Sequence, residues 1–146
     1  MIITDEERIK LLKKFFEEDA YAAISGMFIT GISKETAFVE ADIKDIHYNA
    51  DKVAQGGMIY TLADFAFAVI SNYLHPKTVT QSGHITYLRP AACKHLKASA
   101  REIARHGHNS VGEVIVENEC GDIICVASFN GFIKDVSFEE FIKRFI

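Results

Sequence analysis

The most informative part of this 146-residue chain is the stretch Gln55-Gly-Gly-Met-Ile-Tyr-Thr-Leu-Ala-Asp-Phe-Ala-Phe-Ala-Val-Ile-Ser-Asn-Tyr73. It opens with two glycines and continues as an apolar run, which predicts one long helix that ends before His75-Pro76. Asp64 is the only charged residue within it. Burying an unpaired carboxylate is costly, so a chain that places one in such a helix usually has a use for it.

The composition indicates a single domain that covers residues 1–146. Hydrophobic residues make up 49% of the chain and aromatic residues 11%, which is ample material for a packed core. The net charge is −4 and the 16 basic residues are scattered, so nucleic acid is not an expected partner. His106 and His108 lie two apart in a glycine turn without a nearby Cys or Asp, so we expect no metal site there.

The sequence predicts a protein that is neither exported nor inserted in a membrane. The N-terminus is acidic and lacks the basic and apolar regions of a signal peptide. The apolar stretch 53–75 is long enough to span a bilayer, but Asp64 near its middle would cost roughly 2.5–3.5 kcal/mol there. Cys93, Cys120 and Cys125 form no CxxC pair and indicate free thiols. We therefore expect a cytoplasmic protein without a membrane partner.

Local patterns predict the remaining elements. Thr4 and Glu7 form a capping-box pattern before a helix over about 5–18, and Ser137 begins a short C-terminal helix over about 137–145. The core between them spans about 20–134. Alternating or β-branched runs predict strands over 37–43, 79–88, 95–103, 111–117 and 123–133.

The order of these elements defines the fold class. Four consecutive strands joined by short turns favour an antiparallel sheet, and the apolar helix must be covered on most sides. A sheet that wraps around a long central helix satisfies both demands. The prediction is an α+β domain.

The spacing around the two glycines resembles the signature of hotdog-fold acyl-CoA thioesterases, in particular the phenylacetyl-CoA thioesterase (PaaI)-like branch. Asn49, Gly56, Gly57 and Asp64 match that signature in residue and spacing, whereas Gln55 stands where the family has a histidine. Two further features support the resemblance: Tyr87-Leu-Arg-Pro90 at the end of a strand, and Gly121 before the last strand. The resemblance covers about residues 20 to 134.

The resemblance implies a role for each matching residue. Asp64 would act as nucleophile or as general base on water, and Gly56 would offer its backbone N–H to the thioester oxygen. Asn49 would position the water or the carbonyl, and Ser82 would hold the water or Asp64. Gln55, Gly57 and Arg89 would contact the substrate. No metal and no cofactor are implied, because coenzyme A is part of the substrate.

The positions of Gly56 and Asp64 carry a further consequence. Eight residues place them about 12 Å apart along one helix, at a rise of about 1.5 Å per residue. No reacting carbonyl lies within about 3 Å of both. If both act on one thioester, they must come from different chains. We therefore expect a homodimer with two equivalent sites at the interface, with dimers pairing further into tetramers.

The predicted activity is hydrolysis of a medium-chain or aryl acyl-CoA to free acid and coenzyme A. Because Gln cannot titrate near neutral pH, the alternative is a hotdog protein that binds an acyl-CoA or another ligand as a sensor or carrier. Hydration of an enoyl-CoA is disfavoured, since the Asp–His loop of hydratases is not visible. Structural roles also remain open: a capping carboxylate for Asp64, an Asx-turn for Asn49 and a plain strand hydroxyl for Ser82.

Overall fold

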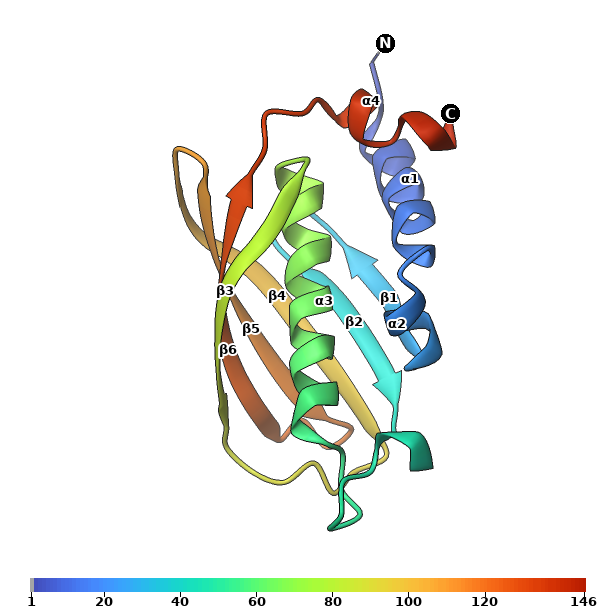
Figure 1. Ribbon diagram of the computed structural model, residues 1–146, viewed down its shortest axis with the longest axis vertical. Helices are drawn as coiled ribbons and strands as arrows, with labels where there is room; N and C mark the ends of the chain where they lie inside the picture. The colour runs from blue at the N-terminus through green and yellow to red at the C-terminus, as the bar shows by residue number, and fades with distance from the viewer. Residues whose placement is uncertain (1) are drawn as a thin grey trace.

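One antiparallel sheet of six strands curves around a single long helix, α3 (Gly56–Leu74), in the computed structural model, which describes residues 2–146 (Figure 1). This is the predicted α+β hotdog arrangement. The strand order across the sheet is β1-β2-β4-β5-β6-β3. The strands are β1 (Met27–Ile32), β2 (Ala37–Asp42), β3 (Thr78–Tyr87), β4 (His95–His106), β5 (Asn109–Asn118) and β6 (Ile123–Ile133).

Helix α3 is the centre of the core because most of its circumference is apolar and small. Leu62, Ala63, Ala66 and Phe67 are fully buried. The Phe67 ring stacks on Phe129 of β6 at 5.4 Å between centroids. By length and composition α3 could cross a membrane, but 67% of its apolar window is buried inside the domain. Its hydropathy is therefore explained by the sheet around it.

The N-terminal segment lies beside α3 on the same side of the sheet (Figure 1). Helix α1 (Asp5–Glu17) begins with the predicted capping box, in which Thr4 and Glu7 satisfy each other's backbone N–H. Phe16 contacts Phe65 of α3 edge to face at 5.5 Å. A second short helix, α2 (Ala20–Ile24), follows, which no sequence pattern predicted.

Several boundaries differ from the sequence prediction. The segment around Gly31, to which we gave no strand of its own, forms β1. Strand β4 extends to His106, three residues beyond the predicted end. The predicted C-terminal helix is a single turn, α4 (Phe138–Phe141), followed by the 3-10 turn η2 (Lys143–Phe145). A further 3-10 turn, η1 (Asp45–His47), precedes the loop into α3.

Strand β3 forms one edge of the sheet and pairs only with β6 within residues 2–146. A β-bulge shifts its register, so that Thr80 pairs with Gly131 but Ser82 pairs with Asn130. Most residues from Gln81 to Tyr87 are exposed. A long exposed edge strand is a template for pairing with another chain.

Candidate active site

Asp64 projects from the middle of α3 toward β3. Its carboxylate is half-buried and accepts a hydrogen bond from Thr80 Oγ1 at 3.1 Å. No ion pair to Asp64 exists within residues 2–146. Burial raises the pKa of Asp64 above its usual value, although the Thr80 hydrogen bond acts in the opposite direction. A carboxylate with few solvent partners and no cation is a comparatively strong base.

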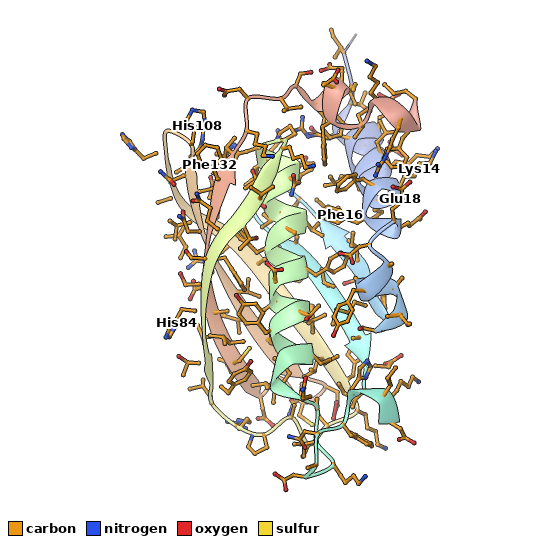
Figure 2. The ribbon with its side chains drawn as sticks, viewed as in Figure 1. Lys14, Phe16, Glu18, His84, His108 and Phe132 are labelled. Carbon is orange, nitrogen blue, oxygen red and sulfur yellow. The ribbon has the colours of Figure 1, made fainter. Side chains whose placement is uncertain are left out.

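Thr80 makes the contact with Asp64 that we expected from Ser82. The bulge at Gln81 is the reason, because without it the two residues would share one face of the strand. Ser82 instead pairs with Asn130, whose side chain bonds Gln81 on the face away from α3. His84, two residues further on the same face, points away from α3 in Figure 2. As a direct partner of Asp64, Ser82 was the wrong residue.

The N-terminus of α3 presents free backbone donors. Met58 and Ile59 both donate to the Gln55 carbonyl, whereas the N–H groups of Gly56 and Gly57 have no acceptor within residues 2–146. Such unpaired donors, with the partial positive charge of the helix end, suit a carbonyl oxygen that is becoming an oxyanion. The predicted donor at Gly56 is thus available for a ligand.

Gln55 is the N-cap residue of α3 and is exposed. Its backbone N–H donates to the His47 carbonyl at 2.7 Å, which fixes the entry into the helix. Its side chain makes no capping hydrogen bond, and its Oε1 lies 2.8 Å from the point where a Cβ on Gly57 would stand. The carboxamide therefore lies directly beside the free amides, with donor and acceptor atoms available to a ligand.

A groove of about 570 Å³ opens beside these amides. Three predicted site residues line it, namely Asn49, Gly56 and Arg89, and Asp51, Tyr87 and several apolar residues complete the wall. Asp64 is not among its lining residues. Within one chain, Asn49, Gly56 and Arg89 therefore lie together around the groove, and Asp64 lies apart from them.

Asn49 has the local structural role that the sequence left open. Its Oδ1 accepts hydrogen bonds from the backbone N–H of Asp51 at 2.9 Å and of Val53 at 3.3 Å, which is an Asx-turn. The turn shapes the loop before α3. Because Asn49 also lines the groove, its Nδ2 is the atom left to bond a ligand.

Arg89 is one of the lining residues of the groove. Its guanidinium is about half exposed and lies 3.4 Å from an Asp122 carboxylate oxygen. An exposed pair of this kind is weak, so the guanidinium can exchange Asp122 for a phosphate.

Two residues near the site were missed as functional residues. Thr80 was missed because a bulge cannot be read from alternation in one strand. Tyr87 belonged to the motif that we noted, yet its contact was not foreseen: its hydroxyl donates to the Gly56 carbonyl at 2.7 Å. The only available signal for Tyr87 was its position two residues before Arg89.

Comparison with known proteins agrees with this architecture. No family model matches the chain. A curated protein from Archaeoglobus fulgidus named "Putative esterase" is 30% identical over 122 residues, covering 83% of this chain and 78% of that protein. A protein of the same name from Deinococcus radiodurans is 37% identical over 75 residues, about half of each chain (51%).

Solved structures give the same result at the level of fold. The E. coli PaaI protein from the phenylacetic acid degradation operon superposes with a TM-score of 0.85 at 21% identity, covering 91% of this chain and 97% of that one. A hypothetical thioesterase from Streptococcus pneumoniae, crystallised with coenzyme A, has a TM-score of 0.76 at 24% identity, covering 83% and 95%.

The fold and the helix with its glycine pair define a hotdog protein. The chain belongs to the esterase family of its Archaeoglobus relative, and its fold is the hotdog fold of the E. coli PaaI protein.

Proposed function

We propose that this protein is a homo-oligomeric acyl-CoA thioesterase that releases free acid and coenzyme A. One observation carries the proposal: a half-buried carboxylate without a cation, Asp64, lies on the same helix as two free amides, at Gly56 and Gly57. Hydrolysis of a thioester needs a base and an oxyanion site but little acid assistance, because the thiolate is a good leaving group.

The separation of these groups supports a site shared between two subunits. If Asp64 of one chain faces Gly56 or Gly57 of its partner, the two copies of α3 run antiparallel and cross near Tyr60 and Thr61. Positions 56, 57, 60, 61, 64, 68 and 74 of α3 are its less buried positions. Five of them, 57, 60, 61, 64 and 68, recur at helical spacing, consistent with a face toward a partner. The bare edge of β3 lies on the same side, where Thr80 reaches Asp64. A second copy is the natural partner of this surface.

The proposed reaction begins with the thioester carbonyl oxygen on the free amides of one subunit. Asp64 of the other subunit removes a proton from water, the water oxygen bonds to the carbonyl carbon, and a tetrahedral oxyanion forms. The C–S bond then breaks, the acid leaves and the thiolate takes up a proton. Direct attack by Asp64, through an anhydride that water then hydrolyses, uses the same groups. An oxyanion donor of this kind contributes about 10²–10³ in rate.

The groove residues fit the coenzyme A part of the substrate. The Streptococcus pneumoniae neighbour was crystallised with coenzyme A, which supports a similar ligand here. Arg89 and Asn49 line the groove and provide a cation for a phosphate and an amide donor. The Gln55 carboxamide lies beside Gly57 and provides a second amide donor near the carbonyl. We propose a medium-chain or aryl acyl group, in line with the phenylacetic acid operon of the E. coli neighbour.

Gln55 favours a second candidate, a protein that binds acyl-CoA without hydrolysing it. A panel of straight-chain and aryl acyl-CoA thioesters, followed with a thiol-detecting reagent, separates the two. Release of thiol with turnover supports the enzyme. Saturable acyl-CoA binding in calorimetry without thiol release supports the carrier or sensor.

Mixed dimers test the shared site. Asp64→Asn and Gly56→Val chains, each inactive alone, would be co-expressed with two different tags. Random pairing gives mixed dimers in half of the population, each with one intact site, so about one quarter of wild-type activity should return. Absence of any recovery in purified mixed dimers would show that each site belongs to one chain.

A further inference from the structure

Tyr87, the last residue of β3, lies over the first turn of α3. Its hydroxyl donates to the Gly56 carbonyl oxygen at 2.7 Å, across 31 residues of sequence. Tyr87 also lines the groove beside the free amides. This hydrogen bond joins the end of β3 to the start of α3, where a substrate carbonyl would bind.

The hydrogen bond acts on a particular peptide group. The Gly56 carbonyl belongs to the same planar amide as the Gly57 N–H. A donor on the oxygen of an amide polarises the group and strengthens its N–H as a donor, because hydrogen bonds in chains reinforce one another. It also fixes the orientation of an amide between two glycines, the residues with the greatest backbone freedom.

The packing shows that the contact of the Tyr87 ring with the start of α3 needs a glycine at position 56. A Cβ on Gly56 would stand 3.2 Å from the Tyr87 hydroxyl oxygen and 3.3 Å from Cζ, so the phenol occupies the space that a side chain would use. Burial raises the pKa of Tyr87 above its usual value, which keeps the phenol protonated and able to donate at neutral pH.

We propose that Tyr87 is a positioning residue for the oxyanion site: it orients and polarises the Gly56–Gly57 peptide, so that the Gly57 N–H is aimed at the substrate carbonyl. This inference rests on the proposed thioesterase function. It adds Gly57 as a donor beside Gly56 and assigns the Tyr87 hydroxyl an indirect role through that amide.

Tyr87→Phe removes only the hydroxyl. We expect kcat to fall about 5- to 20-fold, the usual effect of one well-placed hydrogen bond, with KM changed less than about twofold. The matched control is Tyr21→Phe, the same chemical change at an exposed tyrosine of α2, and it should leave both constants unchanged. Equal kcat in Tyr87→Phe and wild type would overturn the inference.

A spectroscopic measurement separates polarisation from loss of structure. An acyl-CoA ketone analogue, in which CH₂ replaces the thioester sulfur, can be bound to the protein and its carbonyl stretch followed by infrared difference spectroscopy. A weaker donor in Tyr87→Phe should move that band to higher wavenumber than in wild type. An unchanged band with intact binding would overturn the inference.

These outcomes are distinguishable from failure of the proposed function. If wild type binds the ketone analogue but releases no thiol from any acyl-CoA, the thioesterase function fails, and the carbonyl band still tests Tyr87. If wild type hydrolyses acyl-CoA while Tyr87→Phe matches it in kcat and band position, the function stands and the role of Tyr87 fails.

Discussion

Asp64 on one side of the sheet and a pair of carboxylates on the other side have opposite electrostatic surroundings. On the side of α3, Asp64 is half-buried and bonded only to the neutral Thr80 hydroxyl. On the outer side, Glu40 and Asp42 of β2 flank His95 of β4, whose Nε2 and Nδ1 each lie 2.7 Å from one carboxylate. A neutral imidazole carries one N–H, so two such contacts require a protonated ring.

The pKa directions follow from these surroundings. Burial raises the pKa of Asp64. Hydrogen bonds from Thr30 and His95 lower that of Glu40, and the bond from His95 lowers that of Asp42. The hydrogen bond to Glu40, with that to Asp42, raises the pKa of His95. A carboxylate that has its cation stabilises the fold, whereas one held without a cation is available for chemistry.

The strongest test of this contrast is Asp64→Asn, which keeps the size and the acceptor for Thr80 but removes the charge. Loss of a general base reduces turnover by about 10²–10⁴, measurable as thiol release from acyl-CoA. The same substitution should raise the melting temperature at pH 7. The raised pKa of Asp64 means that its stability contribution is present below about 3.8 and is lost as pH rises through the folded-state value.

That gain in melting temperature should therefore disappear in acid. An Asp64→Asn protein with wild-type turnover would show that Asp64 is only a structural carboxylate.

A smaller effect is expected when Thr80, the hydrogen-bond donor to Asp64, is replaced. Thr80→Val deletes the hydrogen bond that lowers the pKa of Asp64, so the pKa rises further. Because the base must be ionised, the acid limb of kcat/KM against pH moves to higher pH, and activity on that limb falls about fivefold for a hydrogen bond of about 1 kcal/mol. Ser82→Ala is the control and should leave the profile unchanged. A shift in Ser82→Ala instead would restore the assignment made from the sequence.

The smallest effect is expected on the outer side of the sheet. The raised pKa of His95 means that its stability contribution is complete below about 6.5 and is lost as pH rises through the folded-state value. His95→Gln should lower the free energy of unfolding at pH 6 by on the order of 1 kcal/mol or less, since the cluster is partly exposed to solvent.

The deficit of His95→Gln should shrink in alkaline denaturant titrations, and thiol release should be unaffected. The control is His106→Gln, the same substitution at an exposed histidine of the same strand that does not lie between two carboxylates. A deficit of the same size at pH 6 and at alkaline pH would contradict a charged His95.

Residue order alone was enough to predict the central helix, the strands that follow it and the separation of Gly56 from Asp64. These features depend on periodicity and on residue spacing along one element, which are local properties. The contrast between the long apolar run of α3 and the alternation in 95–103 was therefore sufficient for the fold class. Three of the predicted site residues, Asn49, Gly56 and Arg89, line one groove, and their roles there stay predictions.

The identity of the side chains that contact Asp64 and Gly56 depends on the folded sheet. The bulge at Gln81 exchanged Ser82 for Thr80, and a strand end brought Tyr87 to the Gly56 carbonyl. The register between β2 and β4 set His95 between two carboxylates. Each of these depends on how residues far apart in the chain align across a sheet, and a one-residue shift in register turns every side chain to the other face.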